Sequence, residues 1–252
     1  MKIIALVTIL LINNLWAFDV LREKDIINKH VRFQIENLAE PSKAQAEFVQ
    51  KQKEMIEGKG LKLWGIGLFS GTDPFAYGIK LGTASKWSHV AVVLIDENKQ
   101  RYCYESNGSL SQLLKKIPPQ VQIHKWKDVV SRYPGQIATR KFRFSDSSRN
   151  DAHAIQQFVY KRLGTPYEKD LEDLVLAVFR ENKEEKLSSV FCSEEAAHIL
   201  MEFKYLANDR LDANYIPRDF SQQEFIPLID CKLGKERLVK KHGVSTCCFS
   251  LQ

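Results

Sequence analysis

Apolar and β-branched residues gather in stretches of the chain that have the length of β-strands. Residues 63–69 and 136–144 are two of them, and the second alternates polar and apolar side chains. Residues 90–95 are another, and the short polar segment 96–100 separates them from a further β-rich run at 101–105. Two such runs joined by a short polar loop predict a β-hairpin.

Helical periodicity dominates the second half of the chain. Residues 151–163 place apolar side chains on one stripe and are followed by Gly164, a residue that commonly ends helices. Residues 171–179 predict a second, short helix, and a third begins at Cys192. Strands followed by helices, without regular alternation, predict an α+β fold in which helices pack against an antiparallel sheet.

The ends of the chain differ from its middle. Residues 1–17 have the order of a secretory signal: Lys2, an apolar run too short to cross a bilayer, and a small residue at the expected cleavage point. A buried N-terminal strand or helix is the alternative. Residues 18–60 predict a helical extension, and residues 242–252 a C-terminal tail. We therefore expect the main domain at 61–241, in a secreted or periplasmic protein.

Composition narrows the class of protein. Of the 252 residues, 44% are hydrophobic and 27% charged, as in globular proteins. The formal net charge of +6 is spread along the chain and interrupted by acidic residues, so we expect no nucleic-acid partner. The cysteines lack the spacing of zinc ligands, and we expect a monomer with neither metal nor organic cofactor. Disulfides and a glycan at the Asn107 sequon stay open.

The predicted hairpin brings two chemically informative side chains together. A loop centred between Glu97 and Asn98 places His89 and Glu105 opposite or diagonal to each other, with Cβ atoms about 5–7 Å apart. A carboxylate at that distance can orient an imidazole and stabilise its protonated form. Taken alone, the pair would be interpreted as a strand-edge histidine beside a solvated glutamate.

Cys192 stands where a nucleophile would be activated. It opens a predicted helix, where the helix dipole and unpaired backbone N–H groups favour a thiolate and can stabilise an oxyanion. Glu194 and Glu195 oppose this effect, so a protonated histidine has to outweigh them. Taken alone, a buried structural cysteine is the simpler interpretation. The remaining histidines are interpreted as structural or surface residues: His30, His124, His153, His198 and His242.

The three candidate residues belong to a series of short motifs. In chain order these are Trp87-Ser88-His89-Val90, Tyr104-Glu105-Ser106, Tyr133-Pro134-Gly135, Gly164-Thr165-Pro166-Tyr167, Phe191-Cys192-Ser193-Glu194 and Tyr215-Ile216-Pro217-Arg218-Asp219-Phe220. The series resembles the YiiX-like family of circularly permuted papain-fold hydrolases, in the NlpC superfamily. The resemblance implies an NlpC-type fold with Cys192 as nucleophile, His89 as base and Glu105 orienting that base. Glu195 departs from the family pattern, which has an apolar residue there, and would change the rim of the site.

The resemblance also implies a cysteine-dependent hydrolase of the amidase or peptidase kind, which forms an acyl-enzyme on an amide or ester bond. Tyr167 is a further candidate for contact with the oxyanion or the substrate, an amide- or acyl-bearing peptide or lipid. Three alternatives stay open: a lipid-directed acyltransferase, a thioesterase of the same superfamily, and a non-catalytic binding module. Membrane attachment through a palmitoylated Cys247-Cys248 pair conflicts with secretion and is not favoured.

Overall fold

The computed structural model describes residues 43–107, 119–167, 176–183 and 189–241. The chain divides into two compact units, Met1–Lys43 and Ala44–Gln252, and the described residues after Lys43 belong to the second. The signal segment expected at 1–17 and the tail expected at 242–252 lie outside the described residues. Most of the helix expected at 171–179 lies outside them as well.

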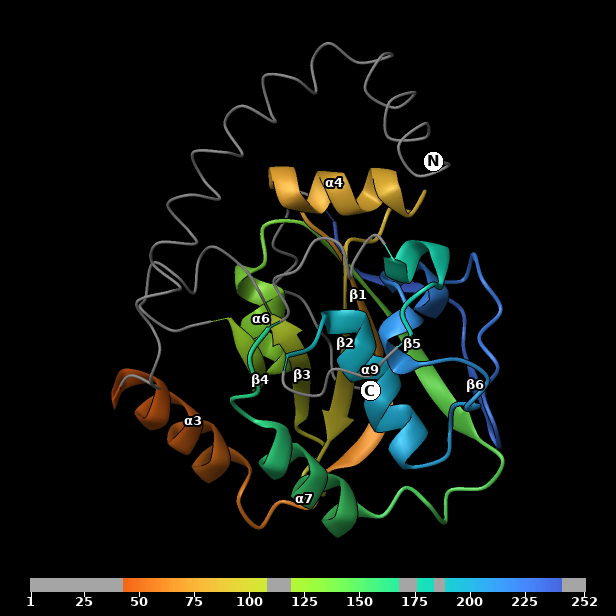
Figure 1. Cartoon of the computed structure of the whole chain (residues 1–252). Helices are drawn as coiled ribbons and strands as arrows, with labels where there is room; N and C mark the ends of the chain where they lie inside the picture. The colour runs from red at the N-terminus through yellow and green to blue at the C-terminus, as the bar shows by residue number, and fades with distance from the viewer. Residues whose placement is uncertain (1–42, 108–118, 168–175, 184–188, 242–252) are drawn as a thin grey trace, which may run out of the picture. The chain divides into compact units, whose positions relative to one another are not determined.

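Helices and strands do not alternate regularly along the chain. In chain order they are α3 (Lys43–Ile56), β1 (Lys62–Ser70), α4 (Pro74–Gly82), β2 (His89–Ile95), β3 (Arg101–Asn107), β4 (Gln120–Lys125), α6 (Trp126–Arg132), β5 (Gln136–Phe144), α7 (Ala152–Arg162), α9 (Cys192–Glu202), the 3-10 turns η1 (Asp212–Asn214) and η2 (Pro217–Phe220), β6 (Cys231–Leu233) and β7 (Arg237–Lys240) (Figure 1).

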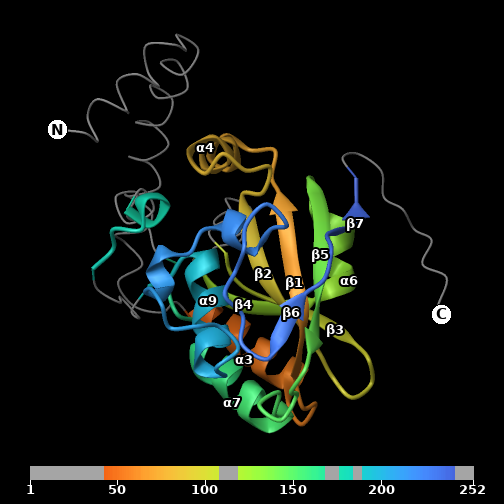
Figure 2. The same cartoon turned by 90° about the vertical axis from the view of Figure 1, so that its right-hand side faces the viewer.

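The described strands form an antiparallel sheet in the order β4-β3-β2-β1-β5-β6, with β7 also paired to β5. Side chains of β2 alternate between two cores, because successive residues of a strand point to opposite faces. Val90 and Val92 enter one core, with residues of α9, and Ala91 and Val93 enter the other, with Trp126 of α6. Helices α9 and α6 accordingly lie on opposite faces of the sheet (Figure 2). The α+β fold with an antiparallel sheet is confirmed.

The predicted hairpin is confirmed as β2 and β3. Val92 faces Tyr104 and Ile95 faces Arg101, a register in which Glu105 lies diagonal to His89 rather than opposite it. The strands expected at 63–69 and 136–144 are confirmed as β1 and β5, which pair with each other. The helix expected at 151–163 is confirmed as α7, and the one expected from Cys192 as α9.

Two elements near the candidate residues were not expected from the sequence. The Asp73 side chain caps α4 by accepting a hydrogen bond from the N–H of Ala76 at 2.9 Å, but Pro74 after Asp is as typical of a turn as of a helix start. Strand β4 carries Gln120 and Gln122, both fully buried. The segment does alternate polar and apolar residues, but it is only six residues long and contains just two apolar side chains, Val121 and Ile123, so the sequence pattern was too weak to identify it as a strand.

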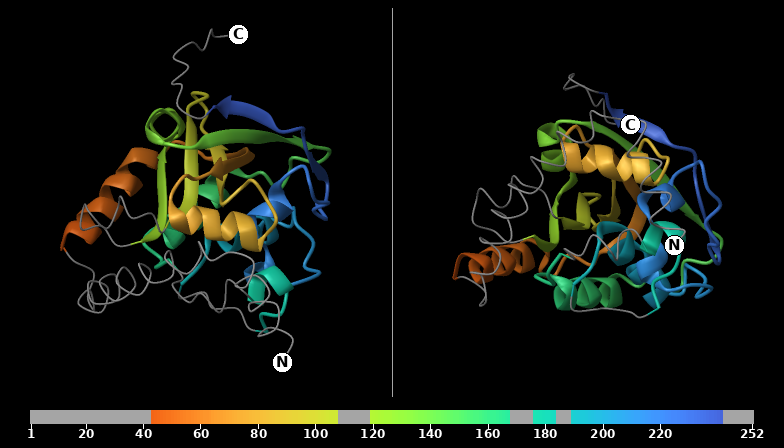
Figure 3. Two further views of the ribbon diagram at one scale, coloured as in Figure 1. Left: turned by 90° about the horizontal axis from the view of Figure 1, so that it is seen from above. Right: turned by 45° about the horizontal axis from the view of Figure 1, so that its top comes forward.

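Helix α4 follows β1 directly and precedes β2. It lies across the end of the sheet at which β1 ends and β2 begins (Figures 1 and 3). The first residue of β2 is His89, so this end of the sheet is where the candidate site has to be built.

Helix α3 belongs to the compact unit that contains the sheet. Ile56 is fully buried in the larger core, and the side-chain amide of Gln52 donates to the carbonyl of Ile123 on β4 at 2.9 Å. This unit begins at Ala44. The domain boundary expected at residue 61 stays a prediction, because an amphipathic helix can pack on its own domain or on a neighbouring one with the same pattern.

Candidate active site

His89 is held at the start of β2 by its pairing with β1. Phe69 faces His89 in the register, and the N–H of Ser88 donates to the carbonyl of Phe69 at 2.9 Å. The Phe69 and His89 rings lie 5.3 Å apart, centroid to centroid. Backbone pairing with β1 and contact with the Phe69 ring together give the imidazole a defined orientation.

Glu105 lies buried beside His89. Its Oε2 is 2.7 Å from Nε2 of His89, while its Oε1 accepts the side-chain amides of Asn107 at 2.9 Å and Gln122 at 3.2 Å. Burial alone would raise the pKa of this carboxyl, but the hydrogen bond and charge of His89, the Asn107 amide and the charge of His124 together lower the pKa to about 2. Glu105 is therefore an ionised acceptor at neutral pH.

Cys192 is the first residue of α9, and its thiol meets the ring of His89. Hydrogen bonding from that ring and from the backbone N–H groups of Val90 and Ser193 acts on the pKa of the thiol. Since Nε2 of His89 faces Glu105, we infer that Nδ1 faces the sulfur. Burial would raise the pKa of the thiol, but the charge of His89 and these hydrogen bonds outweigh burial and lower it.

The same contacts raise the pKa of His89, whereas they lower that of Cys192. Burial would lower its pKa, but the charge and hydrogen bond of Cys192 and those of Glu105 raise the pKa of His89 to about 10. A lowered thiol pKa beside a raised imidazole pKa favours a thiolate–imidazolium pair at neutral pH. The structure thus brings together all three residues of the expected set.

The two acidic residues that follow Cys192 do not lie on the rim of the site. Glu194 accepts a hydrogen bond from the N–H of Phe191 at 3.0 Å and caps its own helix. Glu195 is 1% exposed, and its carboxylate binds the guanidinium of Arg162 and the hydroxyl of Tyr104. The expectation that Glu195 changes the rim is wrong, because its charge is balanced inside the protein.

Tyr133 is a site residue for which sequence reasoning assigned no role. Its hydroxyl is hydrogen-bonded to Ser88, and its ring packs edge-on against Phe69 with centroids 5.1 Å apart. Burial raises the pKa of the Tyr133 phenol, and the charges of Asp73, Glu105 and Cys192 add to this effect. The phenol is therefore neutral and able to donate a hydrogen bond at neutral pH. Its segment, Tyr133-Pro134-Gly135, stood among the motifs of the resemblance, but no spacing rule connects it to Cys192.

Tyr167, the other tyrosine of interest, lies beside the residue that precedes the nucleophile. Its ring packs edge-on against Phe191 at 5.9 Å, and its backbone forms a bridge with Val190. This position borders the start of α9, and a contact of Tyr167 with substrate stays a prediction.

Among the other histidines, His198 has an acidic partner that sequence spacing did not reveal. Its Nδ1 lies 2.9 Å from Oδ2 of the buried Asp212, and the ring packs against Phe158. His124 faces Cys103 in the pairing of β3 with β4. Neither histidine is among the groups that act on the Cys192 thiol most strongly, so both are interpreted as structural.

Thiols, metal-binding groups and membrane spans were searched for in the described part of the chain. Cys103, Cys192 and Cys231 are free, buried thiols. Within residues 43–107, 119–167, 176–183 and 189–241, no group of three or more His, Cys, Asp or Glu is placed to hold a metal ion. None of the described helices combines the length and the apolar character needed to cross a membrane.

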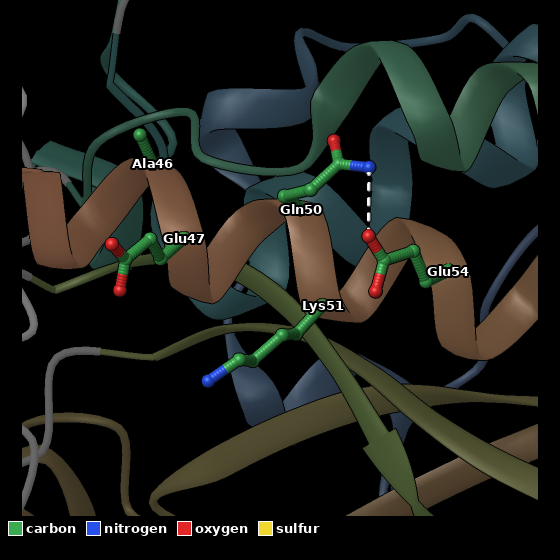
Figure 4. Close-up of a pocket in the computed structure, with 5 residues that line it drawn as sticks. All are labelled: Ala46, Glu47, Gln50, Lys51 and Glu54. Carbon is green, nitrogen blue, oxygen red and sulfur yellow. Dashed lines mark hydrogen bonds between the residues drawn. The ribbon is translucent and has the colours of Figure 1, made fainter.

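A surface hollow occurs elsewhere, along the exposed side of α3. Its lining residues come from that helix alone: Ala46, Glu47, Gln50, Lys51 and Glu54 (Figure 4). The Gln50 amide donates to the Glu54 carboxylate at 3.1 Å. None of the candidate residues lines this hollow.

Comparison with known proteins finds similarity among solved structures alone. No family model matches the chain, and no curated protein matches it. Among solved structures, the chain is similar to the crystal structure of the metalloprotein YiiX from Escherichia coli O157:H7. The match has 15% sequence identity and a TM-score of 0.38, and covers 71% of this chain and 97% of that one. What Cys192, His89 and Glu105 can do therefore has to be argued from their own contacts.

Proposed function

We propose that the protein is a cysteine-dependent hydrolase of the amidase or peptidase kind, with a circularly permuted papain-like arrangement of the NlpC type. The observation that carries this proposal is that the ring of His89 contacts the Cys192 thiol and the Glu105 carboxylate at the same time. A nucleophile, a base and a group that orients the base are the minimum set for covalent acyl transfer. Their order along the chain, His89, Glu105, Cys192, is that of the permuted arrangement.

In the proposed resting state, Cys192 is a thiolate and His89 an imidazolium. The thiolate attacks the substrate carbonyl carbon, and the carbonyl oxygen takes up the negative charge. When the tetrahedral intermediate collapses, the bond to the leaving group breaks, and His89 gives its proton to that group. Neutral His89 then removes a proton from water. The hydroxide formed in this way attacks the carbonyl carbon of the thioester that joins the acyl group to Cys192. The bond to the sulfur then breaks and the acid is released. Cys192 is again a thiolate and His89 an imidazolium.

The developing oxyanion needs donors close to the sulfur. The start of α9 supplies backbone N–H groups and the positive end of a helix dipole, and the Ser193 N–H already reaches the sulfur. We propose the Tyr133 hydroxyl as a side-chain donor for the same charge, because it lies near Cys192 and stays protonated at neutral pH.

One observation favours an acyl lipid as an alternative substrate, for a transferase or thioesterase of the same superfamily. Helix α4, at the same end of the sheet as His89, exposes Phe75 (43%), Tyr77 (54%) and Leu81 (79%). Apolar side chains next to a site suit an acyl chain better than a polar peptide. A non-catalytic binding module on the same fold is the alternative from outside the enzymes.

The test compares matched cysteine variants on defined substrates. Wild type, Cys192→Ala and Cys231→Ala are incubated with amide, ester, thioester and acyl-lipid substrates, since both cysteines are 5% exposed. We expect Cys192→Ala to lose hydrolysis and Cys231→Ala to keep it, and the preferred substrate separates amidase from lipid enzyme. Full activity in Cys192→Ala would end the proposal. A wild-type Cys192 that is inert to a thiol probe at neutral pH would favour the binding module.

A further inference from the structure

The Glu105 carboxylate is surrounded by neutral hydrogen-bond donors in addition to its partner His89. Oε1 accepts hydrogen bonds from the amide nitrogens of Asn107 and Gln122, at 2.9 and 3.2 Å. Each donor is placed by the sheet: Asn107 lies on the face of β3 that carries Glu105, and Gln122 faces Glu105 directly from β4.

This arrangement separates the two oxygens of Glu105. Oε1 is occupied by amides, and Oε2 is left for Nε2 of His89 at 2.7 Å. An amide turned the other way would set its oxygen against a carboxylate oxygen, so the nitrogens of Asn107 and Gln122 must face Glu105. A carboxylate held at both oxygens cannot rotate away from the imidazole.

We propose that Asn107 and Gln122 are positioning residues, which hold the Glu105 carboxylate with Oε2 directed at His89. The role rests on the proposed function, because it matters only if His89 acts on Cys192. The amides carry no charge, so they add donors without competing with the imidazolium for the carboxylate.

Asn107 also belongs to the Asn107-Gly108-Ser109 sequon. A glycan would be attached to Nδ2, the atom that donates to the buried Glu105 carboxylate. A glycosylated Nδ2 would keep one N–H, but the sugar would have to fit beside the buried Glu105 carboxylate, so the geometry favours the unmodified amide.

If Asn107 and Gln122 only satisfied buried polar groups, replacing them would lower the stability of the protein and change nothing else. The positioning role predicts a change in the titration of Cys192 as well. The titratable groups facing Glu105 come from several elements: His89 on β2, Cys103 on β3, His124 on β4 and Tyr133 after α6. All of them are kept in the test below.

The test measures the rate of Cys192 alkylation by iodoacetamide between pH 4 and 10 in the full chain, with the modified peptide followed by mass spectrometry. Wild type is compared with Asn107→Ala, Gln122→Leu and the double variant. Gln120→Leu is the matched control, since Gln120 is also fully buried on β4 and accepts the Gln45 amide instead. Thermal unfolding of each variant verifies that it folds.

We expect the alkylation midpoint to rise by roughly 1 pH unit in the double variant, which lowers the rate about tenfold at pH values well below the wild-type midpoint. In the single variants the alkylation midpoint should rise by less. These variants also provide the test if the double variant does not fold. Gln120→Leu should retain the wild-type midpoint. An unchanged midpoint in the folded Asn107 and Gln122 variants would overturn the positioning role, as would an equal shift in Gln120→Leu. A wild-type midpoint near that of an ordinary thiol would instead overturn the proposed function.

Discussion

The guanidinium of Arg162, at the end of α7, binds the carboxylate of Glu195 in the first turn of α9. Its Nε lies 3.2 Å from Oε1 and 3.1 Å from Oε2, and its terminal nitrogen also contacts Oε2. Glu195 is almost wholly buried, and Tyr104 on β3 donates to the same carboxylate. The start of the helix that carries Cys192 is thus tied to a neighbouring helix and to the sheet.

Removing one partner of this pair should be costly for stability. Arg162→Met leaves the buried Glu195 carboxylate without its counter-charge, and we expect a loss of about 3–5 kcal/mol in the free energy of unfolding. The double variant Arg162→Met/Glu195→Leu removes both charges and should recover most of that loss. Denaturant unfolding of the two variants measures this. Equal losses in both would show that the ion pair is not what holds α9.

Removing the imidazole should abolish the reactivity of Cys192 at neutral pH. In His89→Ala, burial acts on the thiol without the opposing charge, so its pKa should rise above the ordinary value of 9.0. Alkylation of Cys192 would then need a more alkaline solution, and the rate at pH 7 should fall at least about tenfold. His153→Ala is the control, because His153 is exposed on α7. A wild-type alkylation profile in His89→Ala would contradict the thiolate–imidazolium pair.

Acid should remove the contribution of Glu105 to stability. Its pKa is lowered from 4.5 to about 2 in the folded protein, so the unfolded chain takes up this proton first as the pH falls. The stabilisation is present above pH 4.5 and is lost as the pH falls toward 2. We therefore expect the difference in unfolding free energy between wild type and Glu105→Gln to shrink over that interval. Denaturant titrations at several pH values measure it, and a constant difference would count against an ionised Glu105.

Two glycines should respond to alanine in opposite ways. A Cβ on Gly135 would lie 1.9 Å from the carbonyl oxygen of Ser70, so Gly135→Ala has to displace backbone, and we expect a loss of about 1–3 kcal/mol. A Cβ on Gly78, inside α4, meets nothing within 4 Å. Gly78→Ala should therefore stabilise the protein by about 0.5–1 kcal/mol, since alanine loses less backbone freedom in a helix. Thermal unfolding of both variants tests the signs.

The parts of the fold that were predictable are those set by neighbours in sequence. The β2–β3 hairpin and helices α7 and α9 follow from apolar periodicity and short connections, and the hairpin alone places His89 near Glu105. The contact of Cys192 with His89 does not follow in this way. It was expected only from the resemblance, because α9 and β2 meet through packing that no local pattern records. That the three act as a catalytic set stays a prediction.

What could not be predicted depends on polar groups that are buried. Gln122 and Glu195 look like surface residues in the sequence, since polar side chains are normally solvated. In the folded chain each lies inside because a specific partner binds it: Glu105 accepts a hydrogen bond from Gln122, and Arg162 donates to Glu195. Periodicity and turn chemistry act over a few residues and can be identified in the chain itself. Partners that are distant in sequence meet only when the sheet and helices have packed, so the charges around Cys192 are a property of the folded protein.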